Sequence, residues 1–190
     1  MTTIGVIGAG AWGTALAQAM ASDGSPVLLW ARESELVEEI NQCPGASLAP
    51  TVRATGNLAD LAQVPVLLAV VPAQFLARVL ADLPPGPRDL VLCAKGIEAG
   101  TGRLMADVAA EAAPQTTLAV LSGPTFAHEV AAGLPTAVTL ACAGGEAQWQ
   151  RLAPEVSRPM LRPYYSDDVT GAEIGGAVKN VLAIACGVVD

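Results

Sequence analysis

Lysine is scarce in this chain. Lys95 and Lys179 are its only lysines, and every other cation is an arginine. Arginine keeps its proton in a protein, whereas a lysine whose pKa is lowered can release one. The scarcity therefore indicates two positions at which ammonium chemistry matters, although two surface cations that drifted to lysine would leave the same count.

Several signals of other protein classes are missing. No uninterrupted apolar run reaches the ~18 residues of a membrane span, and no basic leader of a signal peptide precedes the first strand. Cys43, Cys93, Cys142 and Cys186 form no C-x-x-C pair, so we interpret them as small buried residues of a cytosolic protein and expect no metal site. The formal net charge of −8 argues against nucleic acid and membranes as partners. We therefore expect a cytoplasmic protein in which any local cluster of cations is informative.

The most specific motif lies at the start of the chain. Residues 3–7 read as an apolar strand, the glycines Gly8, Gly10 and Gly13 follow in a G-x-G-x-x-G pattern, and residues 14–21 favour a helix. Such glycines allow a tight turn and let a pyrophosphate approach the helix N-terminus. The pattern in this context predicts dinucleotide binding, the alternative being a glycine-rich structural turn. Trp12 would then pack beside the cofactor or plug the strand–helix corner.

The second strand, expected over residues 27–30, carries the signal for cofactor type. An NAD site usually places an acidic residue about 20 residues after the fingerprint, where it binds the ribose 2′-hydroxyl. This chain has Arg32 followed by Glu33. A guanidinium at this place can hold the 2′-phosphate of NADP, whereas Glu33 could bind the hydroxyl of NAD. NADPH is the expected cofactor, with NAD possible; an exposed cation at a helix start is the plain alternative for Arg32.

Strands and helices alternate along the rest of the chain. This alternation predicts an α/β fold, a Rossmann-type doubly wound and mostly parallel sheet with helices on both faces. We assign residues 1–168 to this cofactor-binding domain and residues 169–190 to the first helix of a truncated helical domain. Further strands are expected over residues 66–71, 89–94, 117–121, 135–142 and 159–165, and helices over 74–83, 103–113, 144–152 and from 171 onward.

Ligands of an open parallel sheet bind beyond the carboxyl ends of its strands. Lys95 follows one predicted strand and residues 122–127 follow the next, so both should lie at the cofactor edge. Gly123 would allow close backbone approach and Thr125 would offer a hydroxyl, unless this segment is an ordinary turn with Thr125 as a cap.

Six segments together resemble the NAD(P)-dependent glycerol-3-phosphate dehydrogenases, most closely the prokaryotic biosynthetic branch. The resemblance implies a Rossmann domain followed by a helical domain, and the interconversion of sn-glycerol 3-phosphate and dihydroxyacetone phosphate, which supplies glycerol 3-phosphate for phospholipid synthesis. We also expect a homodimer. The segments are residues 8–17, 95–98, 122–127, 129–130, 133–136 and 173–185.

The resemblance also implies residue roles. Lys179 would be the proton acceptor, and Lys95 would contact both substrate and cofactor. Gly123 and Thr125 would contact the substrate, and Trp12, Arg32 and Ala127 would line the cofactor site. The glycine fingerprint and the ribose argument add to that site Gly8, Gly10, Ala11, Gly13 and Glu33. The chain departs from the family at Ala11, where serine is frequent, and at His128, where lysine is common. We interpret His128, the only histidine, as a solvated helix position and not as an acid–base group.

The two lysines suit the implied chemistry. Oxidation of a secondary alcohol needs hydride transfer and removal of the hydroxyl proton, and the proton acceptor works best when its pKa lies near the working pH. Burial and a second nearby cation both favour a neutral amine, and Lys95 close to Lys179 would provide that cation.

Two other functions fit part of the pattern. A 3-hydroxyacid or 6-phosphogluconate type dehydrogenase also pairs a Rossmann domain with a lysine on the next helix, but residues 95–98 and 122–127 argue against it. A nucleotide-binding module that only senses redox state would not need both lysines in matched motifs.

Overall fold

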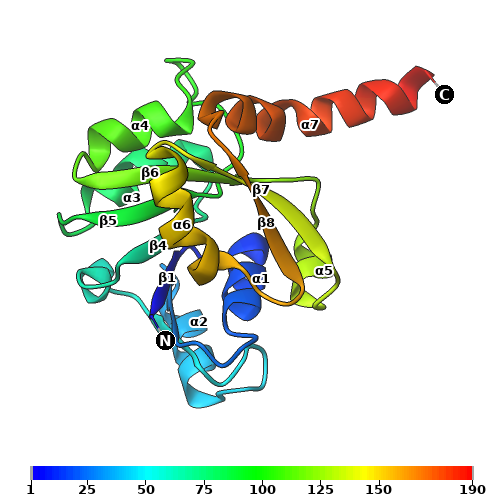
Figure 1. Ribbon diagram of the computed structural model, residues 1–190. Coiled ribbons are helices and arrows are strands. Elements are labelled where there is room, and N and C mark those ends of the chain that lie inside the picture. Colours follow the sequence, from blue (N-terminus) through cyan, green and yellow to red (C-terminus); the bar gives the residue numbers. More distant parts are fainter. Residues whose placement is uncertain (1, 190) are drawn as a thin grey trace.

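The computed structural model describes residues 2–189, which build one eight-stranded sheet flanked by helices (Figure 1). The strand order is β3-β2-β1-β4-β5-β6-β7-β8. The strands are β1 (Ile4–Ile7), β2 (Val27–Trp30), β3 (Val52–Thr55), β4 (Val66–Ala69), β5 (Arg88–Leu92), β6 (Thr116–Ser122), β7 (Thr136–Cys142) and β8 (Leu161–Ser166). The helices are α1 (Ala11–Met20), α2 (Ser34–Gln42), α3 (Leu76–Ala81), α4 (Met105–Ala112), α5 (Ala127–Ala131), α6 (Gly145–Val156) and α7 (Val169–Val189), with short 3₁₀ turns η1 (Leu58–Leu61) and η2 (Ala73–Phe75).

The strand order reverses at β1. Ile7 pairs in parallel with Trp30 of β2 on one side and with Ala69 of β4 on the other. Strands β1 to β6 are all parallel, whereas β7 runs antiparallel to β6 and β8 runs parallel to β7. The prediction of a Rossmann-type, mostly parallel sheet is confirmed, and the switch point beside β1 is where such a sheet binds ligands.

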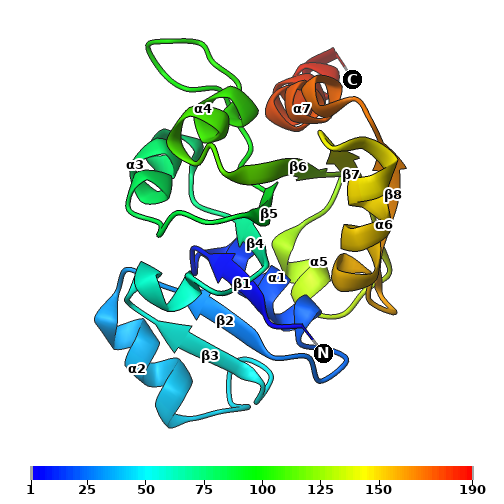
Figure 2. The same ribbon diagram turned by 60° about the vertical axis from the view of Figure 1, so that its left-hand side comes forward.

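Each face of the sheet packs against its own set of helices. On one face Leu16 of α1 and Leu152 of α6 are fully buried, together with side chains of α2 and α5. On the other face Leu76 of α3 and Val108 of α4 are buried, and the start of α7 packs beside them. Figure 2 shows this layered arrangement from a second direction. Burial on both faces holds the strand ends, and therefore the loops that follow them, in fixed positions.

Several sequence expectations need correction. Helix α2, strand β3 and turn η1 were not expected, and α1 begins at Ala11 rather than residue 14. Helix α6 continues past Pro154 to Val156, beyond the expected end at residue 152. All four cysteines are free thiols, but only Cys93 and Cys142 are buried; Cys43 and Cys186 are exposed, so the expectation of buried cysteines is wrong for those two.

Helix α7 divides into two halves with different surroundings. The first half packs on β6 and β7, whereas the second projects away from the sheet (Figure 1). Its residues Val181, Leu182, Ile184 and Val188 are 59–81% exposed. Among residues 2–189 no single helix is long and apolar enough to cross a membrane; only the segments Val169–Lys179 and Val181–Val188, which meet at a bend of 45°, pass that test of length and composition together.

Candidate cofactor cleft and lysine site

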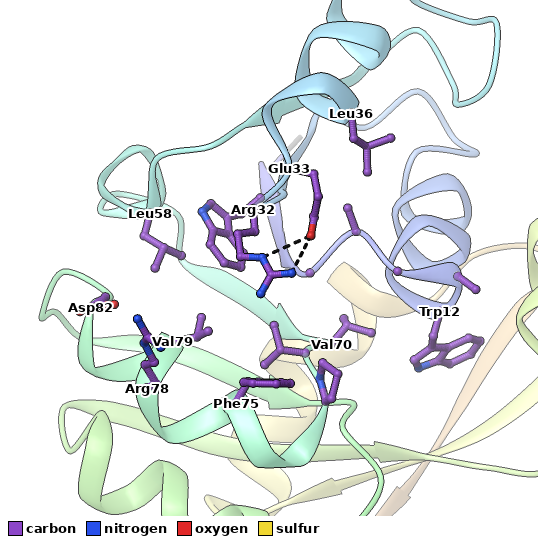
Figure 3. A pocket seen from close by; sticks show the side chains of 17 residues that line it. Trp12, Arg32, Glu33, Leu36, Leu58, Val70, Phe75, Arg78, Val79 and Asp82 are labelled. Carbon is purple, nitrogen blue, oxygen red and sulfur yellow. Dashed lines mark hydrogen bonds and ion pairs between the residues drawn. The ribbon is translucent and has the colours of Figure 1, made fainter.

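A cleft of about 900 Å³ opens at the switch point of the sheet (Figure 3). The loops after β1, β2 and β4 form its walls, with α3 on the side of β4. This volume lies within the range of sites that bind drug-sized ligands and cofactors. Its lining residues are Gly8, Ala9, Gly10, Ala11, Trp12, Trp30, Arg32, Glu33, Leu36, Leu58, Val70, Val71, Pro72, Phe75, Arg78, Val79 and Asp82.

The glycine loop has the geometry that a pyrophosphate site needs. Gly8 has a φ of 113°, which disfavours any side chain. A Cβ on Gly13 would lie 1.8 Å from the carbonyl oxygen of Gly8, so α1 can start this close to β1 only with glycine there. A Cβ on Gly10, by contrast, would meet nothing within 4 Å. Gly10 is the N-cap of α1 without a side-chain cap, so the first N–H groups of the helix are left for an anion.

Arg32 and Glu33 lie together at the adenosine end expected for this cleft. Arg32 donates to Glu33 Oε1 through Nε at 3.3 Å and Nη2 at 3.0 Å. This hydrogen bond lowers the pKa of Glu33. Both side chains are exposed, at 79% and 54%, and solvent screening leaves such a pair with little net stabilisation. A phosphate could therefore displace Glu33 from the guanidinium at small cost.

A second cavity of about 340 Å³ adjoins the cleft. Trp12, Val70, Val71 and Pro72 line both spaces, so one ligand can extend from the first into the second. The second cavity contains both lysines, Lys95 from the loop after β5 and Lys179 from α7. The structure thus brings together two residues that lie far apart in the sequence.

Aromatic rings and backbone hold the two ammonium groups. Lys95 Nζ lies 5.9 Å from the centre of the Trp12 ring and donates a long hydrogen bond of 3.5 Å to the Gly123 carbonyl oxygen. Lys179 Nζ lies 5.3 Å from the centre of the Phe126 ring. Both distances suit cation–π attraction. Without an acidic partner among these contacts, the pair presents net positive charge to the cavity.

Partial burial of the Lys95 ammonium and the charge of Lys179 both lower the pKa of Lys95, and the Cys93 thiol opposes them. Burial raises the pKa of the Cys93 thiol itself to about 12, so this cysteine stays protonated and is no nucleophile. The lowered pKa means that the cavity disfavours the charged form of Lys95. A bound anion would stabilise that charged form, so the cavity suits an anionic ligand.

The segment after β6 forms the remaining wall. Thr125 and Ala127 line the second cavity, while Gly123 packs under β7 and contributes its carbonyl oxygen to Lys95. A Cβ on Gly123 would lie 3.2 Å from the Ala137 carbonyl oxygen, so this turn packs tightly against β7. His128 is exposed on α5, 5.8 Å from the Phe126 ring, as its assignment to a solvated helix position predicted.

Trp12 lines both cavities and so does more than close the strand–helix corner. Its Nε1 is buried and has no hydrogen-bond partner among the described residues. A buried hydrogen-bond donor without a partner destabilises a folded protein. An acceptor atom of a ligand bound where the two cavities meet would satisfy this donor. The open space at Gly10, the apolar walls and this donor all fit a dinucleotide.

Several lining residues were not identified from the sequence. Phe75, Arg78 and Val79 reach the cleft from η2 and α3, opposite Arg32 (Figure 3). The signal was present, because these residues follow β4, the strand directly beside β1, and residues beyond its carboxyl end must face the switch point. In residues 2–189 no three His, Cys, Asp or Glu side chains gather as a metal ion would require.

Comparison with known proteins assigns the family. Residues 3–148 match the domain described as NAD-dependent glycerol-3-phosphate dehydrogenase N-terminus. The glycerol-3-phosphate dehydrogenase [NAD(P)+] of Novosphingobium aromaticivorans is 70% identical over 98% of this chain and 59% of its own length. The protein of the same name from Paramagnetospirillum magneticum is 52% identical over the whole chain and 72% of its own length.

A solved structure agrees. The crystal structure of glycerol-3-phosphate dehydrogenase from Coxiella burnetii superposes with a TM-score of 0.84 at 37% identity, over 98% of this chain and 60% of that one. The chain thus spans about three fifths of the length of most relatives that it matches. On the match to its N-terminal domain and the identity to its members, the chain belongs to the NAD-dependent glycerol-3-phosphate dehydrogenase family.

Proposed function

We propose that this chain provides the cofactor site and the proton acceptor of an NAD(P)-dependent glycerol-3-phosphate dehydrogenase. The reaction would interconvert sn-glycerol 3-phosphate and dihydroxyacetone phosphate, and the product would serve phospholipid synthesis. One observation carries the proposal: both lysines of the chain face a single cavity that shares a wall with the dinucleotide cleft.

The nicotinamide cofactor would supply or accept the hydride when bound in this cleft. Gly8, Gly10 and Ala11 would present backbone to its pyrophosphate, and Gly13 permits that approach. Arg32 would hold the 2′-phosphate of NADP, with Glu33 as the alternative partner for the NAD ribose. Trp12 and Ala127 would contact the cofactor where the two cavities meet.

The substrate would occupy the second cavity. Its phosphate or its reacting oxygen would lie against Lys95, beside Thr125 and the backbone of Gly123. Lys179 would take the hydroxyl proton during oxidation and return it during reduction. The Lys95 ammonium favours an anionic substrate over a neutral alcohol, since none of the described side chains that line the cavity is acidic. Lys179 must be in its neutral form to accept the proton.

We place the domain boundary at the start of α7, with residues 1–168 as the cofactor-binding domain and residues 169–190 as the start of a second, helical domain. The exposed apolar half of α7 supports this division and also supports a homodimer, because such a surface gains stability when covered. The free thiols favour a reducing compartment, and we propose the cytoplasm.

Steady-state oxidation of NADPH with dihydroxyacetone phosphate, compared with NADH, tests the function in the full-length protein. We expect turnover with both cofactors, with NADPH preferred, and a loss of at least about a hundredfold in kcat for Lys179→Arg, because a guanidinium cannot accept the proton. A substrate panel with 3-hydroxyacids and 6-phosphogluconate serves as control. Near-normal activity of Lys179→Arg, or turnover of the control substrates only, would contradict the proposal.

A further inference from the structure

Glu173 on α7 is buried, although no cation among the described residues forms an ion pair with it. The side chain is 7% exposed, and its Oε1 accepts a hydrogen bond of 2.8 Å from the backbone N–H of Ala106. Ala106 lies in the first turn of α4, a helix whose own N-cap residue, Leu104, offers no side-chain oxygen. Glu173 therefore caps α4 from a distant part of the chain, where the helix dipole favours a carboxylate.

Few other interactions stabilise the Glu173 carboxylate. Its Oε2 is buried without a hydrogen-bond partner among the described residues. Burial and the nearby charge of Asp107 raise the pKa of Glu173, while the backbone N–H groups of Ala106 and Met105 lower it. A buried carboxylate oxygen without a partner costs free energy, so its retention calls for a structural explanation.

Two further residues of α7 lie at or beside the lysine site. Gly176, one turn after Glu173, lies so close to β6 that a Cβ would stand 2.9 Å from Ser122 Oγ and 3.8 Å from Lys95 Cγ. Lys179 lies three residues further on and faces the second cavity, turned about 120° around the helix axis from Glu173. Because Val169–Lys179 is one helical segment, the docking of Glu173 and Gly176 fixes the rotation of this segment and therefore the direction in which Lys179 emerges.

We propose that Glu173 is a positioning residue: by capping α4 it fixes the depth and rotation of α7, and so places the Lys179 ammonium beside Lys95 in the substrate cavity. The catalytic role of Lys179 rests on the proposed function. The positioning of Lys179 by Glu173 does not depend on that function. The role lies in geometry, since Glu173 itself lines neither cavity.

The scarcity of lysine makes the placement measurable. With lysine ¹³C-labelled at Cε, the 190-residue chain gives only two side-chain signals by NMR, one for each lysine. Burial and, after it, the charge of Lys179 lower the pKa of Lys95, so withdrawal of Lys179 should remove part of this shift and move the Lys95 titration upward, toward the ordinary lysine value of ~10.4. Amide exchange at Ala106 reports the cap itself.

We expect Glu173→Ala to raise the Lys95 pKa and to speed amide exchange at Ala106 by at least about tenfold. Glu173→Gln keeps an oxygen that can accept the hydrogen bond. It should leave the Lys95 pKa and the exchange rate at Ala106 near those of the wild type. Glu111→Ala, which removes an exposed carboxylate from the same helix α4, is the matched control and should also leave both unchanged.

An unchanged Lys95 titration in a folded Glu173→Ala protein would overturn the proposal. If that variant does not fold, Gly176→Ala takes its place, since the added methyl should push α7 away from Ser122 and raise the Lys95 pKa in the same way. An unchanged titration in folded Gly176→Ala would overturn it equally.

Kinetics of the full-length protein separate this proposal from the proposed function. Glu173→Ala should lower kcat at least about tenfold while the KM for NADPH changes less than about twofold, with rescue by Glu173→Gln. If the wild type shows no oxidation of NADPH with dihydroxyacetone phosphate, the proposed function fails, but the lysine titration still decides the role of Glu173.

Discussion

Glu33 accepts two hydrogen bonds from the Arg32 guanidinium through a single oxygen, Oε1. The residue expected to bind an NAD ribose and the residue expected to bind an NADP phosphate are thus partners of each other at the mouth of one cleft. A phosphate must take Arg32 from Glu33, whereas a ribose hydroxyl needs Glu33 itself. We therefore expect the pair to serve both cofactors, with Arg32 binding NADP and Glu33 binding NAD.

Arg32→Ala should weaken NADPH far more than NADH. The loss for NADPH should be about 1.5–3 kcal/mol, the value of a hydrogen bond to a charged group, while NADH should change little. Dissociation constants from fluorescence titration measure this, with Arg53→Ala, an arginine outside the cleft, as the control. Equal losses for both cofactors would show that Arg32 does not recognise the 2′-phosphate.

Glu33→Gln should have the opposite effect on NADPH. Removal of the carboxylate frees Arg32 from an exposed and therefore weak ion pair, so NADPH should bind slightly more tightly. NADH should bind more weakly if Glu33 holds the ribose. The same titrations measure both, and weaker NADPH binding would contradict competition between Glu33 and the phosphate.

The glycines of the loop should differ sharply in their tolerance of alanine. Gly13→Ala places a methyl on the Gly8 carbonyl oxygen and should destabilise the fold by at least about 1–3 kcal/mol, as overpacking does. Gly10→Ala meets no neighbour within 4 Å, so the fold should persist while NADPH binding weakens. Urea unfolding and cofactor titration of the pair measure this; similar stabilities would contradict the packing argument.

Lys95→Met should stabilise the chain at neutral pH. The pKa of Lys95 is lowered in the folded state, so the unfolded chain binds more protons between that pKa and ~10.4, and wild-type stability rises with pH across this window. Methionine removes the free-energy cost of holding a charged Lys95 in the folded state. The difference in stability between variant and wild type should therefore shrink as the pH rises toward ~10.4. Urea midpoints at pH 7 and pH 10 test the trend, and a variant less stable at pH 7 would refute it.

The second half of α7 should drive self-association of the 190-residue chain. Ile184 is 69% and Leu182 59% exposed, and contiguous apolar surface of this kind promotes association. Sedimentation velocity should show dimers or larger species that Leu182→Glu with Ile184→Glu returns to monomer. His128→Glu, a charge added at an exposed position of α5, is the control and should not dissociate them.

Local signals in the sequence predicted the centre of the fold well. The glycine pattern of residues 8–13 predicts the loop between β1 and α1, because only glycine fits the contact of Gly13 with Gly8. The position of Lys95 at the cofactor edge follows from its place directly after β5. Helix α2 and strand β3 were missed because the short strand Val52–Thr55 contains Arg53 and has no clear period. The direction of β7 also cannot be read from alternation, because a parallel and an antiparallel strand show the same apolar pattern.

The site was predicted less completely than the fold. The meeting of Lys95 with Lys179 was expected from a resemblance and not from spacing, because it depends on where α7 lies after β8. The cap that Glu173 places on α4 joins residues 67 positions apart. Nothing in the local sequence of α7 distinguishes that glutamate from a solvent-exposed one, so only tertiary packing reveals it.

The two lysines leave the 190-residue chain few sites for amine-directed reagents. Apart from its α-amine, both primary amines of this chain belong to side chains that line one cavity. In the 190-residue chain, acylating reagents, aldehydes and amine-directed crosslinkers would therefore react only at this cavity and at the α-amine. Mass spectrometry of such adducts would then report occupancy of the cavity, since a bound anion should protect both lysines together.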